Sequence, residues 1–432
     1  MKNKKYIVFV GYISKRTAGL IRIYKKLHNK NWEIIVLRSP EMKPHKYGVT
    51  IDFDDAKSIK KFFHEYGKEI FSITAQTEDS ISLFKKIIPY TPKEIFTPTV
   101  KSLLLCTEKT EMRRAFRKYD KSITPKFYIF RDYSDEKIQK VVNTLHFPVI
   151  VKPSGLSASM LVQAAYYKEE LESILKKSFL LLKKVHKEKK GRGTPMILVE
   201  ELVDGNVYSV DAQINNSGGI YFNPFVDYKI AHQKGFEDFF VYDVSVPTDL
   251  SAELIEQAQI VATKGIKALG LINSTAHIEL IYKNNKWKII EIGARVGGNR
   301  SVLYKKTLDI NIDINDILIR ANEKPRIKAK KLGYSSMLKF YPRKEGYLNR
   351  LRGIRKIRKL PSVSLINVNF KRGDKSLLAK HGGKYIVKSI DITNKTMMIK
   401  FNRWFPSSKC PYGRCIGYFS WFRSASCFQC PS

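Results

Sequence analysis

Short apolar runs alternate with helical patterns along the first 106 residues, and this alternation restricts the fold most. Runs at residues 6–10, 33–37 and 70–74 are predicted strands. Residues 17–28 and 80–88 carry apolar side chains at the spacing of an amphipathic helix. Strands joined through helices form parallel sheets, because a parallel pair needs a long crossover connection. The pattern predicts a small parallel α/β domain. Its glycines do not form G-x-G-x-x-G, so nothing supports a dinucleotide site there.

Length and composition indicate several globular domains. A chain of 432 residues, of which 43% are hydrophobic, suits two to four packed domains. No run of about 18 apolar residues occurs, so the sequence predicts no membrane-spanning helix. The apolar stretch near the N-terminus is short, and no small-residue cleavage site precedes Lys15 and Arg16. We therefore expect a buried first strand and a cytoplasmic protein.

Positive charge is concentrated toward the C-terminal end. The net charge is +38, and residues 326–403 hold 22 Lys and Arg against three acids. If the segment around residue 355 were helical, one face would carry four cations: Arg352, Arg355, Lys356 and Lys359. Such a region is either a solvated face or a docking surface for an anionic substrate, a phospholipid or RNA. No aromatic residues alternate with these cations, so we expect no sequence-specific nucleic-acid binding.

The last 29 residues differ sharply in composition from the rest. Residues 404–432 contain no acid and four of the five cysteines, namely Cys410, Cys415, Cys427 and Cys430. Thiolates bind zinc tetrahedrally, so a zinc site is one interpretation. The irregular cysteine spacing and poor apolar periodicity favour the other, a tail that is disordered or foreign to the native protein.

The middle of the chain mixes helices with strands that alternate like antiparallel ones. Helical patterns cover residues 109–119, 169–187 and 254–269. Predicted strands cover residues 147–152, 196–200, 208–214, 277–281 and 287–292. The last two are expected to form a hairpin across Asn284 and Asn285. Short strands broken by Pro and Gly continue beyond residue 330.

Two of these strands end in charged residues that suit a nucleotide. Lys152 ends a strand and is followed by a proline and a loop of small residues. Small residues let backbone N–H groups approach phosphate oxygens, and the ammonium adds a point charge. Glu200 and Glu201 follow another apolar strand. They are either an exposed edge or carboxylates placed to read an adenine amino group.

Glu279 and Glu291 lie on the two strands of the predicted hairpin, among apolar neighbours. If both face one side, the carboxylates repel each other unless a cation lies between them. Hard oxygen ligands that also bridge to substrate phosphates describe magnesium. Arg295 follows four residues after Glu291, where it could hold an anionic substrate or stabilise a transferring phosphoryl group.

Four motifs occur in order between about residues 104 and 299. They are K-x-x-M-R from Lys109, F-P-V-I-V-K-P from Phe147, E-E-L-V-x-G-x-x-Y-S-V-D from Glu200, and H-x-E from His277 with E-I-x-x-R-x-G-G from Glu291. Each motif is weak alone, but the ordered set resembles the ATP-grasp superfamily, most of all its dipeptide-type carboxylate–amine ligases. The resemblance implies an α/β and α+β architecture. An N-terminal Rossmann-like pre-ATP-grasp domain would precede two lobes that clamp ATP.

The resemblance also implies roles for individual residues. ATP would contact Lys109, Lys152, Ser157, Ser159, Glu200, Glu201 and Leu202, with Ser157 and Ser159 in the loop over the phosphates. Mg²⁺ would lie between Glu279 and Glu291. Arg295 would face an acyl phosphate, and His277 would lie on the substrate side unless it is simply a packed strand residue. Many members carry Asn where this chain has Gly293. That departure implies a water in place of one ligand, or a magnesium ion held less tightly.

These motifs suggest a division of the chain and a reaction. We expect a pre-ATP-grasp domain at 1–106, an ATP-grasp core at 107–325, a basic strand-rich part at 326–403 and the cysteine tail at 404–432. The implied activity is ATP- and Mg²⁺-dependent joining of a small-molecule carboxylate to an amine, with amino acids or peptide-like molecules as substrates. The alternatives are a polyanion-docking factor with a degenerate ATP-grasp core, and an ATP-dependent carboxylase. A homodimer is compatible with the sequence.

Overall fold

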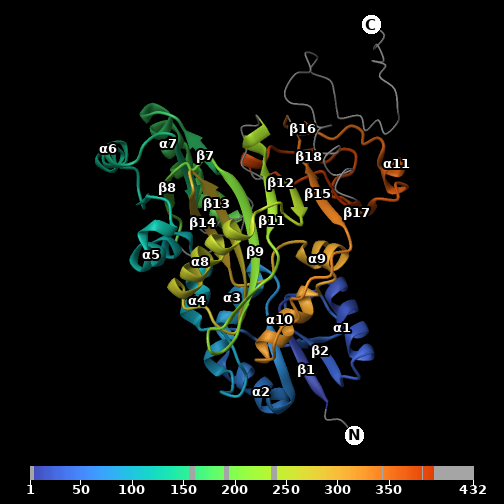
Figure 1. The fold of residues 1–432 in the computed structure, drawn as a ribbon. Helices are drawn as coiled ribbons and strands as arrows, with labels where there is room; N and C mark the ends of the chain where they lie inside the picture. The colour runs from blue at the N-terminus through green and yellow to red at the C-terminus, as the bar shows by residue number, and fades with distance from the viewer. Residues whose placement is uncertain are drawn as a thin grey trace.

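A computed structural model of the chain describes residues 4–154, 161–188, 194–234, 241–342, 344–381 and 383–393. Its N-terminal domain, blue in Figure 1, is a parallel sheet in the order β3-β2-β1-β4. The strands are β1 (Lys5–Val10), β2 (Trp32–Arg38), β3 (Gly48–Thr50) and β4 (Ile70–Thr74). The helices are α1 (Lys15–Leu27), α2 (Ala56–Tyr66) and α3 (Glu78–Ile87). The predicted parallel α/β domain is confirmed.

Local sequence signals explain where these helices begin. Ser14, Asp55 and Thr77 each accept a hydrogen bond from a backbone N–H in the first turn of the helix that follows. A side-chain oxygen at this position satisfies one of the donors that an α-helix leaves without an intrahelical partner.

A small antiparallel sheet, in the order β5-β8-β6-β7, forms a separate lobe. Its strands are β5 (Phe127–Phe130), β6 (Val149–Pro153), β7 (Gln163–Ala165) and β8 (Ile197–Glu201). The helices α6 (Asp135–Thr144) and α7 (Lys168–Glu188) close its core, which includes the fully buried Phe130, Val151 and Leu175. Two further helices, α4 (Val100–Thr107) and α5 (Lys109–Tyr119), lead into this lobe from the N-terminal domain.

A nine-stranded sheet forms the centre of the molecule (Figure 1). Its main path runs β14-β13-β9-β11-β12-β15-β19-β17, and β10 pairs with β9. The strands are β9 (Asn206–Ile214), β10 (Ile220–Phe222), β11 (Val226–Ile230), β12 (Val241–Val246), β13 (Ser274–Lys283), β14 (Lys286–Gly293), β15 (Tyr334–Phe340), β17 (Val363–Val368) and β19 (Val387–Thr393). The accompanying helices are α8 (Ala252–Ala268), α9 (Arg300–Leu308) and α10 (Ile312–Arg320). The basic C-terminal segment therefore supplies three strands of the same sheet that carries the Glu279–Glu291 hairpin.

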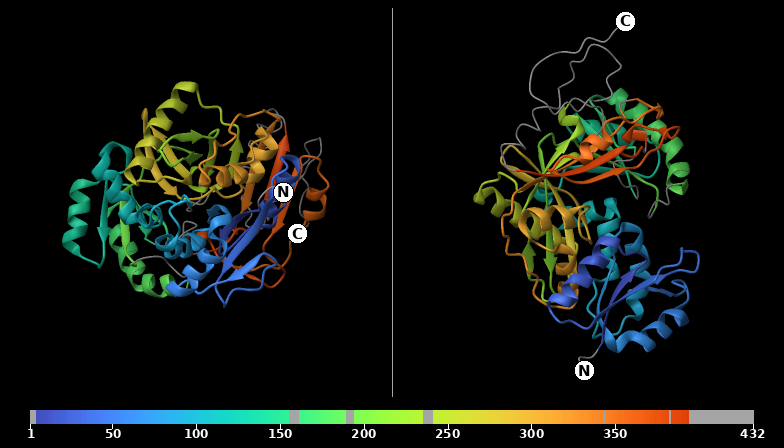
Figure 2. Two further views of the ribbon diagram at one scale, coloured as in Figure 1. Left: turned by 90° about the horizontal axis from the view of Figure 1, so that it is seen from below. Right: turned by 90° about the vertical axis from the view of Figure 1, so that its right-hand side faces the viewer.

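The N-terminal domain shares one hydrophobic core with β9, β13 and β14 of the large sheet, and this core joins residues such as Val10 and Phe84 to Val210 and Ile278. Helix α10 also packs on the N-terminal sheet, and Thr74 there donates a hydrogen bond of 2.6 Å to Asp316. Figure 2 shows this domain directly beneath the large sheet. The domain boundaries at residues 106 and 325 stay predictions.

The basic cluster near residue 355 differs from its prediction. The helix there, α11 (Ile354–Arg358), is five residues long and begins after Gly353 in the left-handed conformation, φ 84°. Arg352 precedes this helix and Lys359 follows it. The expectation that four cations share one helical face is therefore wrong, because a glycine with positive φ interrupts the helical pattern. The remaining pair of strands, β16 (Gly346–Tyr347) and β18 (Lys375–Ser376), stands apart from the large sheet.

Candidate active site

Glu279 and Glu291 lie directly opposite each other on β13 and β14. The strands turn at Asn284 and Asn285, whose φ values of 48° and 58° suit a two-residue hairpin turn. Directly opposed residues of an antiparallel pair project their side chains from the same face of the sheet. The predicted hairpin is confirmed, and it brings the two carboxylates together.

Lys109, the first residue of α5, forms an ion pair with Glu291, with Nζ 3.0 Å from Oε2. Burial opposes ionisation of Glu291, but the charges of Lys109, Arg295 and His277 outweigh it and hold the pKa at about 2. Glu291 is therefore a carboxylate at neutral pH, in a cluster where the sequence predicted both a metal ligand and a phosphate-binding lysine.

His277 connects Glu279 to a buried aspartate. Its Nδ1 lies 2.6 Å from Oδ1 of Asp211, and its Nε2 lies 3.4 Å from Oε1 of Glu279. Burial lowers the pKa of His277, but the carboxylates of Asp211 and Glu279 raise it by more than burial lowers it, so the net shift is upward. Gly297 packs against this pair, and its N–H donates to Asp211 at 2.8 Å. A Cβ there would lie 2.4 Å from the imidazole, so the close approach requires glycine.

Arg295 pairs with a residue of the N-terminal domain, since its Nε lies 2.7 Å from Oε1 of Glu78 in α3. Glu78 precedes the four-motif region, so its part in this cluster was missed. The charges of Glu78 and Glu291 raise the pKa of Arg295 against the opposing effect of burial. Arg295 therefore lies beside the facing carboxylates as a cation.

Glu200 is fully buried at the end of β8 and forms ion pairs with two cations. Arg113 of α5 donates Nε–H to it, and Nζ of Lys152 lies 2.6 Å away. Burial alone would raise the pKa of Glu200, but Arg113 and Lys152 hold it at about 2. Arg113 also donates to the carbonyl of Ile290 at 2.7 Å, which fastens the small lobe to the hairpin strand β14.

The neighbours of Glu200 are engaged as well. The N–H of Glu201 donates to the Lys126 carbonyl at 3.1 Å, and that of Leu202 donates to the Pro148 carbonyl at 3.0 Å. The Glu201 carboxylate lies 2.7 Å from Nζ of Lys288. These hydrogen bonds occupy both amide donors, so any adenine contact from this backbone would use carbonyl oxygens or follow a rearrangement.

Part of the predicted site lies outside the described residues. Ser157 and Ser159 belong to the segment 155–160, and the four tail cysteines to the segment after residue 393. Among the described residues, no group of three or more His, Cys, Asp or Glu is arranged to hold a metal ion. Glu279 and Glu291 together supply two carboxylates as hard oxygen ligands. A pair of carboxylates fits magnesium, because this ion usually takes its other ligands from water and substrate phosphates.

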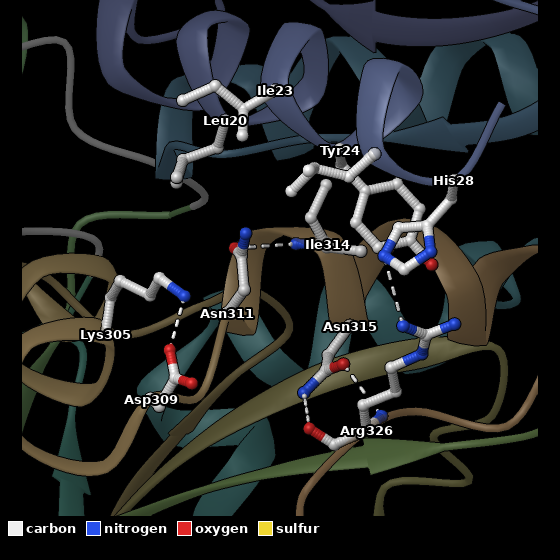
Figure 3. Close-up of a pocket in the computed structure, with 11 residues that line it drawn as sticks. Leu20, Ile23, Tyr24, His28, Lys305, Asp309, Asn311, Ile314, Asn315 and Arg326 are labelled. Atoms are coloured by element: carbon white, nitrogen blue, oxygen red, sulfur yellow. Dashed lines mark hydrogen bonds and ion pairs between the residues drawn. The ribbon is translucent and has the colours of Figure 1, made fainter. Parts of the chain in front are cut away.

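A cavity of about 330 Å³ lies away from this cluster, between α1 and the segment around α10 (Figure 3). Its walls mix apolar side chains such as Ile23 with the polar Asn311, Asn315 and Arg326. No predicted site residue lines it. In the part of the chain that the structure describes, no helix combines the length and the hydropathy needed to cross a membrane.

Two residues of the cluster were present in the motifs without an assigned role. Arg113 ends K-x-x-M-R, and Asp211 ends the third motif. Arg113 follows Lys109 by four residues, so the two side chains project from one side of α5, and the spacing was the available signal. Asp211 lies opposite His277 in the β9–β13 register, which a sequence does not specify.

A family model described as an ATP-grasp domain matches residues 145–302. This segment is an ATP-grasp domain. It contains β6 with Lys152, β8 with Glu200 and the hairpin with Glu279 and Glu291, so the matched segment coincides with the clusters described above.

Curated relatives of the ATP-grasp domain include D-alanine–D-alanine ligases. The protein from Listeria welshimeri is 29% identical over 151 residues, which cover 34% of this chain and 38% of the relative. The protein from Wigglesworthia glossinidia brevipalpis is 24% identical over 241 residues, covering 52% of this chain and 64% of the relative. The matches thus span less than two thirds of the length of these ligases.

Solved structures extend the similarity of fold beyond the ATP-grasp domain. An L-amino acid ligase from Bacillus licheniformis matches with a TM-score of 0.72 at 17% identity, covering 93% of this chain and 97% of that one. An N5-carboxyaminoimidazole synthetase from Staphylococcus aureus complexed with ADP matches with a TM-score of 0.66 at 16% identity, over 93% and 97%. The predicted ATP-grasp fold with an N-terminal Rossmann-like domain is confirmed.

Proposed function

We propose that the chain is an ATP- and Mg²⁺-dependent ligase that joins a carboxylate to an amine through an acyl phosphate. The observation that carries the proposal is the pair Glu279 and Glu291, held face to face with Lys109 on one carboxylate and His277 on the other. The similarity to D-alanine–D-alanine ligases and to an L-amino acid ligase supports the reaction class.

The nucleotide would lie between the small lobe and the large sheet. Lys152 reaches from β6 and Lys109 from α5, so two ammonium groups approach the phosphates from different elements. In this proposal Glu200, already bound to Arg113 and Lys152, fixes the ammonium of Lys152 before ATP arrives. Ser157, Ser159 and the carbonyls of Glu201 and Leu202 remain the proposed contacts of the phosphates and the adenine.

Glu279 and Glu291 would hold magnesium, which neutralises charge on the β- and γ-phosphate oxygens when bound. An oxygen of the substrate carboxylate would then attack the γ-phosphorus, and the bond to the β–γ bridging oxygen would break, giving ADP and an acyl phosphate. The amine would attack the acyl carbon, lose a proton and expel inorganic phosphate.

The chain's own cations would assist the second step. Arg295 lies beside Glu291 as a guanidinium and would hold the acyl phosphate and the oxyanion that develops on the acyl carbon. His277, held by Asp211 and next to Glu279, would take an electrostatic role toward the substrate.

The test is a substrate panel with two readouts. Purified protein is incubated with MgATP and amino acids or other carboxylates, including bicarbonate, singly and in pairs. ADP release and the ligated product are both measured, the second by mass spectrometry. We expect ADP formation to need at least one carboxylate and a new C–N product to appear with a pair. A protein that binds ATP and forms no ADP with any pair contradicts the proposal, and ADP formation with bicarbonate as the acid points to carboxylation.

We also propose that the protein is cytoplasmic and that it can form a homodimer. Fractionation of cells and light scattering of the purified protein would test them.

A further inference from the structure

Two lysines face each other on the C-terminal strands of the large sheet. Lys339 of β15 lies directly opposite Lys388 of β19 in the antiparallel register. Lys388 is 8% exposed, and Lys339 is partly buried. Opposed residues of this kind have Cβ atoms about 5 Å apart, and like charges in such a pair destabilise a sheet. The arrangement therefore has an energetic cost that needs an explanation.

No described residue forms an ion pair with either lysine. The ammonium of Lys388 donates to Oδ1 of Asn299 at 2.8 Å, which orients the group without cancelling its charge. Asn299 precedes α9 in the left-handed conformation, φ 66°. The ammonium of Lys339 makes no hydrogen bond or ion pair with any residue that the structure describes. Burial, and then the charge of Lys388, lower the pKa of Lys339 to about 8.

A third cation lies beneath the same face of the sheet. Arg300, the first residue of α9, is fully buried. It donates to the hydroxyls of Ser209 and Tyr228, whereas Nε and Nη1 have no hydrogen-bond partner among the described residues. Asp211, 3.8 Å from its Nε, is shared with His277. Arg300 therefore adds a third cation, which is fully buried, to the face that carries the lysine pair, with two guanidinium nitrogens that have no hydrogen-bond partner among the described residues.

The lysine pair lies near the proposed catalytic carboxylates. In sheet order, β15 is four strands from β13, yet the charges of Glu279 and Arg300 both act on Lys339. Contacts connect the pair to Glu279: Lys388 binds Asn299, and the next residue, Arg300, donates to Tyr228. The Tyr228 hydroxyl lies 3.4 Å from Nε2 of His277, which lies 3.4 Å from Oε1 of Glu279. The proposed nucleotide-phosphate lysines, Lys109 and Lys152, come from α5 and the small lobe instead.

We propose that Lys339 and Lys388 form an oxyanion subsite for a substrate that carries a carboxylate or phosphate group besides the reacting one. The proposal rests on the proposed ligase function and names its substrate class. The physical argument mirrors the one for Glu279 and Glu291, because two opposed like charges at a buried site are stabilised by a counter-ion. Lys388, oriented by Asn299, and Lys339, without a partner among the described residues, present two ammonium groups to one anion.

The first test measures anion binding directly. Inorganic phosphate is titrated calorimetrically into the full chain, with and without saturating ADP. The variants are Lys339→Met and Lys388→Met, which keep the aliphatic packing, and Lys339→Arg, which keeps the charge. Lys375→Met is the matched control, because Lys375 is an exposed lysine in the same basic region. Thermal unfolding of each variant checks the fold.

We expect the Met variants at the pair to weaken phosphate binding at least tenfold in the presence of ADP, and Lys339→Arg and Lys375→Met to stay within threefold of the unaltered chain. Equal phosphate affinity in all variants would overturn the subsite. An equal loss of ADP affinity would also overturn it, since the lysines would then serve the nucleotide.

The second test uses the substrate panel and distinguishes the two anions. Aspartate and glutamate probe a second carboxylate, O-phosphoserine probes a phosphate, and alanine is the neutral reference. We expect one acidic class to be preferred, and Lys339→Met to raise its KM at least tenfold while the KM for ATP is unchanged. ADP formation without preference for either acidic class would overturn the subsite. If no pair is ligated but phosphate binding still depends on the two lysines, the ligase proposal fails and the anion subsite stands.

Discussion

Glu200 and Glu291 are both ionised glutamates, but one lies in a closed cluster of charges and the other in an open one. Glu200 is fully buried and carries both Arg113 and Lys152. Glu291 has 36% of its side chain exposed, pairs with Lys109 and faces the second carboxylate of Glu279. Both have a pKa of about 2, because in each case nearby cations outweigh burial. The same pKa thus arises once in a closed cluster and once in an open one.

The more open of the two clusters is the one at which a ligand can bind. A closed cluster in which every charge has a partner holds elements together, and removing one charge leaves another uncompensated. An open cluster of two facing carboxylates keeps coordination positions available and loses little stability when one charge is removed. We therefore expect the same substitution, Glu to Gln, to have opposite consequences at the two positions.

Glu200→Gln is expected to have the largest effect on stability. It leaves the buried Arg113 without its carboxylate, and breaking a buried pair in this way typically costs about 3–5 kcal/mol. Urea denaturation measures the change. The folded pKa of Glu200 lies below its ordinary 4.5, so its contribution is present above pH 4.5 and is lost as the pH falls through about 2. A midpoint equal to that of the unaltered chain would remove the distinction between the clusters.

Glu291→Gln is expected to lower ADP formation by about 10²–10³-fold and to change stability by less than about 1 kcal/mol. The substitution removes one of the two proposed metal ligands from a partly exposed site. Coupled-enzyme turnover and urea midpoints on the same preparation provide both readouts. Turnover near that of the unaltered chain would contradict the assignment of Glu291.

Asp243→Asn extends the comparison to a buried carboxyl that forms no ion pair of its own, since Lys229, opposite it in the sheet, pairs with Asp227. Burial raises the pKa of Asp243 to about 6, and Ser336 and Ser245 donate to it. With an unfolded pKa near 3.8, this group reduces stability progressively between about pH 4 and 6, by up to roughly 3 kcal/mol above that window. The Asn variant should gain stability at pH 7.5 and not at pH 4. A gain of equal size at both pH values would show that the carboxyl does not titrate as described.

Lys152→Ala is expected to weaken nucleotide binding about tenfold, because the strand-ending ammonium is a proposed phosphate contact. Fluorescence titration with a nucleotide analogue measures it. Lys288→Ala is the matched control, since Lys288 pairs with the neighbouring Glu201 and has no proposed phosphate contact. Equal nucleotide affinities for the two variants would show that Lys152 only pairs with Glu200 and does not contact the phosphates.

Neutralising the surface cluster is expected to have the smallest effect. Replacing Arg352, Arg355, Lys356 and Lys359 with Gln should raise the KM for ATP at 10 mM salt and change it less than twofold at 150 mM, where exposed charges are screened beyond about 8 Å. Tight RNA binding at 200 mM salt that this variant loses would favour the polyanion alternative instead.

The sequence predicted those parts of the fold that depend on local patterning. Strand and helix alternation located the parallel N-terminal sheet, and Asn284-Asn285 located the hairpin that pairs Glu279 with Glu291. The four-cation helix failed because Gly353 adopts a left-handed conformation that spacing alone does not show. Local sequence signals specify helices and strands, whereas a single residue with a left-handed backbone conformation can interrupt a predicted helix.

The contacts of the site depended on tertiary arrangement. Three pairs of neighbours in the structure lie between 49 and 217 positions apart in the sequence: Arg113 with Glu200, Glu78 with Arg295, and Lys339 with Lys388. Motif order identified the family and most of the candidate residues, but not which cation would meet which carboxylate. Lys152 was expected to contact phosphate directly, and it also binds Glu200. That second partner was not readable from the strand pattern.

The division of hydrophobic cores has a consequence for how the protein unfolds. The N-terminal domain shares one core with β9, β13 and β14 of the large sheet, whereas the small lobe keeps its own around Phe130 and Leu175. Elements that share a core exchange their amide protons as one cooperative unit, and a lobe with a separate core can open by itself. Native-state hydrogen exchange should therefore divide the chain by core and not by sequence order. The amides of β6 and β8 should exchange earlier than those of β1 and β13, although β6 and β8 lie between them along the chain.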